Sequence, residues 1–256
     1  MRRISLAFLL LLTISGAGPI LAGEARFYLA PYGFASRLTG DAQVSDGTTG
    51  TEFNLEDTLG VEPRENILGL DGFVKILGSR IGFGYSEGDH AGDAVLDQTV
   101  TFNGQTYTSG DRVHTEIDFK RYRLMYGYDF SLKVVNFGIL VGLHGIDVDA
   151  RLESEISGLR EGKNLRGVIP AVGATLGIHP ISKLAIHAEA SGLALTISGV
   201  KVKLIDGFAG VDWLFVPKFG VKAGYRYFVL DAQDDDEQDS LNLRQTGPFA
   251  GIALHL

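Results

Sequence analysis

The segment that most constrains this 256-residue chain is FGVKAGYRYFVLD, Phe219 to Asp231, because its side chains alternate in character. A β-strand points successive side chains to opposite faces, so one face is aliphatic and aromatic while the other carries glycine with Lys222 and Arg226. In a water-soluble protein the apolar face would be the core. In an outer-membrane barrel it would face lipid, and the polar face would line the lumen. The alternation alone allows both architectures.

The N-terminus indicates export. MRRISLAFLLLLTISGAGPILAGEA has two arginines, an apolar run from Ile4 to Ile14 and then small residues, which is the layout of a secretory signal peptide. We therefore expect residues 1–23 to be a signal peptide, with cleavage near Ala22 to Ala25, and residues 24–256 to form one β-barrel domain. The apolar run is shorter than the roughly 20 residues of a membrane helix, and no later segment is long enough. The chain has no Cys, so disulfides and thiolate chemistry are excluded.

The same alternation recurs along the chain, and its apolar sets carry almost no charge over the roughly 9–11 residues that cross a membrane. The aromatic residues lie near strand ends, where interfacial belts of a membrane barrel would lie. One expected belt contains Tyr128, Phe130, Trp213, Phe215 and Phe219, and the other contains Tyr85, Tyr225 and Tyr227. This sorting favours the membrane architecture over a soluble sandwich.

The connections support the same conclusion. Alternate links are short, at 78–79, 131–133, 179–183 and 217–218, whereas most others are long and polar, at 37–65, 89–112, 153–166 and 231–242. Short periplasmic turns and long outer loops are typical of outer-membrane barrels. Asn103-Gly104 is a typical tight hairpin turn within one outer loop. We predict an all-β, closed antiparallel up-and-down transmembrane barrel of about ten strands, with eight as the alternative. The expected strands are 25–36, 66–77, 80–88, 113–130, 134–152, 167–178, 184–197, 203–216, 219–230 and 243–256.

The signal peptide, the alternating strands and the terminal FAGIALHL resemble the small outer-membrane β-barrels of Gram-negative bacteria, of the OmpA, OmpX and OmpW kind. FNLEDTLGV and RYRLMYGYDF are similar to segments of uncharacterised proteobacterial barrel proteins. The resemblance covers nearly the whole mature chain and implies location in the cell outer membrane. It also implies contact with outer-membrane lipid and lipopolysaccharide, and with the barrel assembly machinery during biogenesis. That machinery reads a last strand that usually ends in Phe, and here the last residue is Leu256.

The inward faces of the expected strands carry five acids and five bases. A mixed set of charges favours an internal network of ion pairs, whereas rings of one sign would indicate a selective pore. Asp212 and Lys222 are expected to be cross-strand neighbours if the turn at 217–218 is tight. The expected lumen charges are Asp71, Lys75, Arg121, Arg123, Asp129, Glu189, Asp206, Asp212, Lys222 and Arg226. A lining that only avoids lipid, without specific pairing, is the alternative.

Candidate catalytic and metal-binding residues are few. His187, Glu189 and Ser191 share the inner face of one strand, but residues two apart lie about 6–7 Å from each other, too far for contact between a nucleophile and its base. His144 also points inward, opposite Arg121, and is expected to be a hydrogen-bonded lumen residue. No metal-ligand spacing occurs, and we expect no metal, no cofactor and no enzymatic activity.

The acidic run DAQDDDEQDS, 231–240, is either a solvated outer loop or a place where divalent cations bridge to lipopolysaccharide. The net charge of −8 argues against a nucleic-acid partner. We expect an integral outer-membrane barrel with a structural or interaction role, or a narrow channel, whose lumen is largely filled by balanced charges. The alternatives are an OmpW-like transporter of small apolar solutes and a lipid-modifying enzyme.

Overall fold

The computed structural model describes residues 26–45, 50–197, 199–234 and 239–256. The expected signal peptide lies outside the described residues. Within the described ranges, no helix has the length and apolar character needed to cross a membrane.

Ten long strands account for most of the chain, and three short strands lie in its connections. The long strands are β1 (Arg26–Gln43), β3 (Arg64–Ile76), β4 (Ser79–Val95), β7 (Arg112–Leu132), β8 (Val135–Ser154), β9 (Arg160–Ile181), β10 (Leu184–Ile197), β11 (Val200–Val216), β12 (Phe219–Asp234) and β13 (Asp239–His255). The short strands are β2 (Glu52–Asn54), β5 (Val100–Phe102) and β6 (Gln105–Tyr107).

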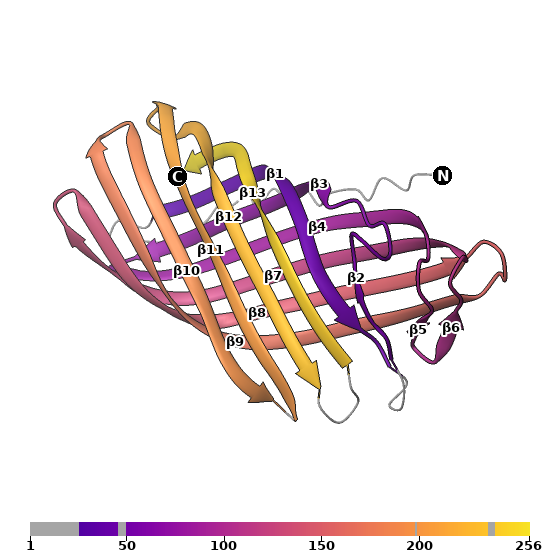
Figure 1. Ribbon diagram of the computed structural model, residues 1–256. Helices are drawn as coiled ribbons and strands as arrows, with labels where there is room; N and C mark the ends of the chain where they lie inside the picture. Colours follow the sequence, from indigo (N-terminus) through magenta and orange to yellow (C-terminus); the bar gives the residue numbers. More distant parts are fainter. Residues whose placement is uncertain (1–25, 46–49, 198, 235–238) are drawn as a thin grey trace, which may run out of the picture.

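The long strands form a closed antiparallel barrel (Figure 1). Each pairs with its sequence neighbour among the long strands, and β13 returns to pair with β1 from His255 opposite Tyr28 to Ser240 opposite Gln43. β2 pairs with the last residues of β1, Asp41 to Gln43, and is not one of the ten long strands. The prediction of a ten-stranded up-and-down barrel is therefore confirmed, and the eight-stranded alternative is wrong.

The two ends of the barrel differ. At one end the strands are joined by two-residue turns, such as Leu77-Gly78, and the last strand ends beside the start of the first. Both residues of that turn have positive φ, 51° and 88°, which suits a tight hairpin. By the pattern of outer-membrane barrels this end faces the periplasm, and the end with longer connections faces outwards. Asn103 and Gly104 also have positive φ and join β5 to β6, as expected for that hairpin.

The outer connections are shorter than predicted, because the strands continue beyond the expected membrane boundary. β1 continues to Gln43, β4 to Val95 and β12 to Asp234, where the sequence was interpreted as loop. Much of 37–65, 89–112, 153–166 and 231–242 is therefore strand. These segments become polar on their outward face outside the membrane, but their backbones still pair. Residues 235–238 of the acidic run lie outside the described residues.

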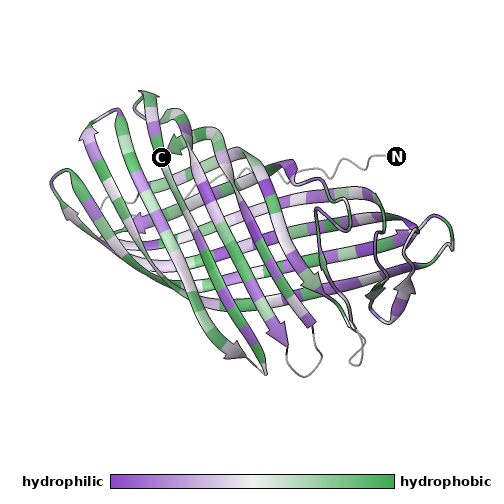
Figure 2. Ribbon diagram, in the orientation of Figure 1, coloured by the Kyte–Doolittle hydropathy of each residue, from purple (hydrophilic) through white to green (hydrophobic). Residues whose placement is uncertain are grey.

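Buried and exposed residues alternate along most of the long strands, except in the outer half of β9. Hydrophobic and hydrophilic residues likewise alternate along many of the strands in Figure 2. Exposed apolar residues form the outer surface, for example Val141, Val211 and Val221. The lumen has two different halves. Charged and aromatic side chains fill the middle and line the periplasmic half. Among the described residues, the outer half holds an apolar core of 21 buried residues, which includes Phe53 of β2 and Phe102 of β5.

One ladder of the barrel stops early. β9 and β10 pair only as far as Val172 opposite Gly192. Beyond that pair β9 stays paired with β8 to Arg160, and β10 stays paired with β11 to Ile197, but the two strands are no longer register partners of each other. In Figure 1, β9 and β10 diverge toward the outer end.

Candidate functional site: a charged layer across the lumen

Asp71 on β3 is the centre of the charged layer. Its carboxylate accepts a hydrogen bond of 2.6 Å from Nη2 of Arg226 on β12 and one of 3.0 Å from Nη2 of Arg123 on β7. Nζ of Lys222 lies 3.9 Å from the same carboxylate. All four side chains are nine-tenths or more buried. The four groups come from three separate parts of the barrel wall, so they tie opposite walls together.

Glu189 and Asp206 continue the layer on the other side of Arg123. Nη1 of Arg123 donates to Oε1 of Glu189 at 2.5 Å, and Arg80 donates to the other carboxylate oxygen at 2.7 Å. Asp206 lies 3.7 Å from Arg121 and 3.9 Å from Arg123. Each acid thus faces two cations, which compensates for the loss of water around it.

Aromatic rings pack between these charges. Nζ of Lys222 lies 4.6 Å from the centre of the Phe208 ring, and the Arg121 guanidinium lies 4.4 Å from the centre of the Phe228 ring. The Arg226 guanidinium lies over Tyr32 at 4.8 Å and donates to its hydroxyl at 2.6 Å. Such contacts stabilise a cation without admitting water. Alternating cations, acids and rings therefore fill the middle of the lumen.

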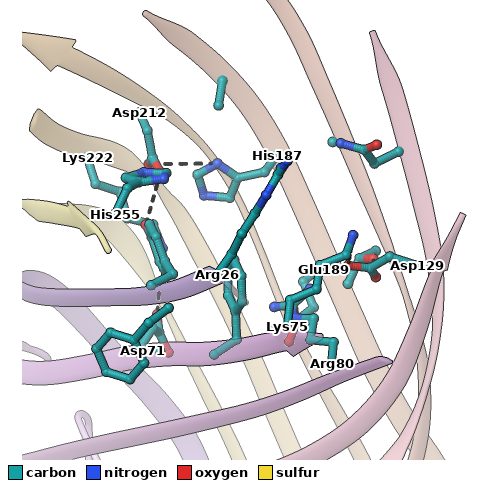
Figure 3. A pocket seen from close by; sticks show the side chains of 18 of the residues that line it. Arg26, Asp71, Lys75, Arg80, Asp129, His187, Glu189, Asp212, Lys222 and His255 are labelled. Atoms are coloured by element: carbon teal, nitrogen blue, oxygen red, sulfur yellow. Dashed lines mark hydrogen bonds and ion pairs between the residues drawn. The ribbon is translucent and has the colours of Figure 1, made fainter. Parts of the chain in front are cut away.

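A cavity of about 400 Å³ lies on the periplasmic side of this layer. Figure 3 shows its side chains, with Asp212 between His187 and His255. The two imidazoles each lie 3.7 Å from the Asp212 carboxylate, and Tyr28 donates a hydrogen bond of 3.0 Å to it. Lys75 and Asp129 form a separate ion pair of 3.0 Å at the edge of the cavity. In the described part of the chain, no three His, Asp or Glu side chains converge as metal ligands do.

All ten predicted lumen charges lie inside the barrel, and the structure brings nine of them into contact with an oppositely charged member of the set. The exception is Asp212, whose polar contacts are His187, His255 and Tyr28. Glu189 has a second partner outside the set, Arg80. Asp212 and Lys222 are direct cross-strand neighbours, as expected. His144 lies opposite Arg123, not Arg121, so that detail of the expected register is wrong by one inward position.

Several residues of the layer were not anticipated. Arg80, Ser86 and Tyr32 all point inward, and each makes a hydrogen bond to the charged set. The alternation of β4 could have identified Arg80 and Ser86, since both share the face of Gly82 and Gly84. Tyr32 could not be identified by the rule that aromatic residues face lipid.

A serine and a histidine also meet in the lumen. Nε2 of His144 lies 3.0 Å from Oγ of Ser191, and Nδ1 of the same ring lies 4.0 Å from Asp206. These residue types resemble a nucleophile, base and acid. All three side chains are buried, and none of them lines the periplasmic cavity. His187, Glu189 and Ser191 do not contact one another through any of the hydrogen bonds described above.

The predicted belt residues lie on the outer surface. The exposed fraction of Trp213 is 45% and that of Tyr225 is 53%. Tyr128, Phe130, Phe215, Phe219 and Tyr227 are likewise exposed. Tyr85 is half-buried because its ring packs against Tyr122 with 5.2 Å between ring centres. All eight point away from the charged layer.

Comparison with solved structures agrees with the fold. The outer membrane protease OmpT from Escherichia coli superposes with a TM-score of 0.54 at 9% sequence identity, over 90% of this chain and 97% of that one. The translocator domain of the autotransporter NalP from Neisseria meningitidis gives a TM-score of 0.46 at 10% identity, over 91% of this chain and 88% of that one. The attachment invasion locus protein Ail of Yersinia pestis gives 0.37 at 16% identity, over 90% and 99%.

No protein-family model matches the sequence. No curated protein matches it either. The closed antiparallel barrel, its apolar outer surface and its likeness to the OmpT barrel define the class: this is a β-barrel of the Gram-negative outer membrane. At 9% identity the likeness to OmpT establishes the fold alone, so the role of the barrel has to be argued from its lumen and its outer end.

Proposed function

We propose that this chain is a closed outer-membrane barrel with a structural or interaction role, and that its lumen does not conduct. The observation that carries the proposal is the contact of Asp71 with Arg226, Arg123 and Lys222, which links opposite walls of the barrel. A ten-stranded barrel lies between eight-stranded barrels, which side chains can fill, and wide porins, which they cannot. Long cations held across the lumen by buried acids close a barrel of this width.

Two further features support closure. The charged layer separates the periplasmic cavity from the outer half, and its members Arg121 and Arg226 are more than nine-tenths buried. Above it, the apolar core adds a second barrier to hydrated ions, because an ion would lose its water there without gaining a partner. The narrow-channel alternative is therefore less favoured by the geometry than the closed barrel.

We assign the interaction role to the outer end of the barrel, where the strands continue beyond the apolar surface. Its outward rows carry both signs of charge, as in the pair Lys120–Glu87 at 3.1 Å and the pair Arg166–Asp147 at 3.0 Å. These rows follow directly after the apolar surface. We propose lipopolysaccharide as the partner of this surface, with lipid as the partner of the apolar surface below it.

Transfer of a small apolar solute is a second candidate function, because a cavity in the outer half is lined mainly by apolar side chains. The enzyme alternative has less support. Ser191 has a hydrogen-bonded base in His144, but a nucleophile also needs space for a substrate. Ser191 is buried and lines neither the periplasmic cavity nor the cavity in the outer half.

Liposome swelling tests the closed lumen. Vesicles that contain the purified barrel are moved into isotonic solutions of arabinose or sucrose, and an open general porin serves as the positive control. The proposal expects swelling no faster than in empty vesicles. Swelling that depends on the size of the sugar would contradict it.

A further inference from the structure

Beyond the last pair, Val172 and Gly192, β9 and β10 separate, and we call the gap between them the β9–β10 seam. The seam begins at the outer border of the apolar surface. Counted from the periplasmic end, Lys203 is the first charged residue on the outward face of β11, and it lies opposite Ala194 of β10. Ala194 is two residues beyond Gly192, the last residue of β10 that pairs with β9. Unpaired backbone is costly in hydrocarbon but is tolerated where water or polar groups reach it. The seam is therefore an opening in the barrel wall at the membrane interface.

Pro170 explains why the ladder stops. The N–H of His179 donates to the carbonyl of Val134, so odd-numbered residues of β9 turn their N–H groups toward β8 and even-numbered residues turn theirs toward β10. The last paired residue is Val172, and the next even-numbered residue is Pro170, which has no N–H. The sequence of β9 thus ends the ladder at a defined place.

A cavity of about 220 Å³ lies inside the barrel on the outer side of the charged layer. Ile117, Val148 and Leu165 line one wall, and Ala232 and Leu243 line another. The lining includes no residue of β10, the strand that has separated from β9. Along the barrel axis, Phe53, Leu55, Leu59 and Phe102 from the connections β1–β3 and β4–β7 cover the cavity. The side of the cavity next to the seam is the less covered one.

Two residues of β9 mark the opening from the cavity to the seam. Leu165 points inward by alternation and lines the cavity, yet it is 41% exposed. Gly167 also points inward and is exposed, and a Cβ atom placed on it would meet no atom within 4 Å. Inward-facing positions deeper on the same strand, Ile169 and Ala171, are buried. The lumen is therefore open sideways at Gly167.

The lipid-facing surface is hollowed directly below the seam. The hollow is bounded by the small residues Ala174 and Ala190, which pair one repeat before the last β9–β10 pair, and by the rings of Tyr225 and Tyr227. It continues over Gly207 and Ala209. A small apolar molecule in the outer leaflet thus meets an apolar surface that leads to the opening.

We propose that the outer cavity is a binding site for one small uncharged apolar molecule, which enters and leaves through the β9–β10 seam. The inference rests on the proposed closed lumen, since the charged layer prevents passage toward the periplasm. The volume exceeds the approximately 150 Å³ of an apolar protein cavity that binds benzene. The lining of the cavity is mainly apolar, which favours an uncharged ligand. Its two cations are paired, Lys163 with Asp239 at 3.1 Å and Arg151 with Asp149 at 3.0 Å.

Fluorobenzene tests the site and its opening in one experiment. The full barrel is placed in lipid nanodiscs, and fluorine NMR saturation transfer measures binding and the rate of exchange with the lipid pool. Ala150→Phe fills the cavity, and Ala232→Phe fills it from the opposite wall if the first variant folds poorly. Gly167→Trp blocks the opening, and Val168→Trp is the matched control, because Val168 is the neighbouring residue and points out to lipid.

The expected result is a bound resonance in the wild type that both cavity-filling variants abolish. Gly167→Trp should slow exchange by more than an order of magnitude, while Val168→Trp leaves it unchanged. Absence of a bound resonance in the wild type would overturn the site. Equal exchange in the two Trp variants would overturn the route through the seam. Either failure could occur with a lumen that does not conduct, so it is distinguishable from failure of the proposed function, which vesicle swelling reports.

Discussion

Nη2 of Arg226 on β12 donates a hydrogen bond of 2.6 Å to Oδ2 of Asp71 on β3. In the sheet these strands are separated by β13 and β1, so the bond spans the lumen and does not follow a ladder. Both side chains are 5% exposed. The pair therefore links two non-neighbouring strands inside the barrel. Arg123 extends the link to β7, and Lys222 adds a second cation from β12.

Removal of the Asp71 charge should destabilise the barrel strongly. Asp71→Asn keeps the shape of the side chain but leaves Arg226, Arg123 and Lys222 without their shared acid. Loss of one partner of a buried ion pair typically costs about 3–5 kcal/mol, because the remaining charge is stranded. Urea-induced unfolding from lipid vesicles measures the loss.

Glu153→Gln is the matched control for Asp71→Asn. Glu153 pairs with Arg160 at the outer end, and both side chains are largely exposed. An exposed ion pair contributes about 0.2–1 kcal/mol, so this variant should unfold nearly as the wild type does. Equal destabilisation by the two substitutions would show that the charged layer has no special role in stability.

Double substitution of Lys222 and Arg226 by Ser should open the lumen and make it selective for cations. The change removes two long side chains and two of the three cations that contact Asp71, so the acids of the lumen, Asp206, Asp212 and Glu189 among them, outnumber the remaining cations of the predicted set. Reversal potentials under a salt gradient measure the selectivity. The double Ser variant of Lys201 and Lys203, which point outward, should behave as the wild type. An anion-selective or silent double variant that is correctly folded would contradict the assignment of these two residues to the closure.

Ser191 should not react as an enzymatic nucleophile. A fluorophosphonate probe labels serines that a base activates and that a substrate can reach. Ser191 has a base in His144, but its side chain is buried. We expect no labelling of the folded wild type and no lipid hydrolysis. Stoichiometric labelling that His144→Ala abolishes would establish a catalytic site in the lumen.

High pH should release the β5–β6 hairpin from the outer end of the barrel. Burial raises the pKa of Tyr107 from 10.0 to about 12, and its hydroxyl donates to the carbonyl of Leu152 at 3.1 Å. The undocked phenol loses its proton at lower pH than the docked one, so docking is fully stable below pH 10 and weakens as the pH rises through 12. A difference titration of wild type against Tyr107→Phe by tyrosine absorbance should show one phenol with this late midpoint. A midpoint at the ordinary value would contradict the buried position.

The sequence predicted the barrel and its strand number because each strand keeps its period of two. The outer limits of the strands were wrong for a physical reason. Lys203 and Asp231 are opposite each other on β11 and β12, so polar residues beyond the membrane still form a ladder there. Polarity on the outward face indicates where the membrane ends, not where the strand ends.

Partners across the lumen could not be derived from the sequence. Alternation indicated that Asp71 and Arg226 point inward, but the distance between non-neighbouring strands depends on the curvature and tilt of the closed sheet. The inward position of Tyr32 is another example. Both faces of β1 carry apolar residues, so nothing in its pattern distinguishes the lumen from the lipid. Pro170 could have predicted the open seam from the sequence, since proline within a sheet is confined to edge strands, strand starts and bulges.

Single-channel recording of the wild-type barrel in a planar bilayer tests the closed lumen most directly. Arg226, Arg123 and Lys222 are held across the lumen by Asp71, and the apolar core lies above them. The predicted result is small or no conductance with little ion selectivity after verified insertion of the folded protein. A large and stable conductance, comparable to that of a general porin, would contradict the account.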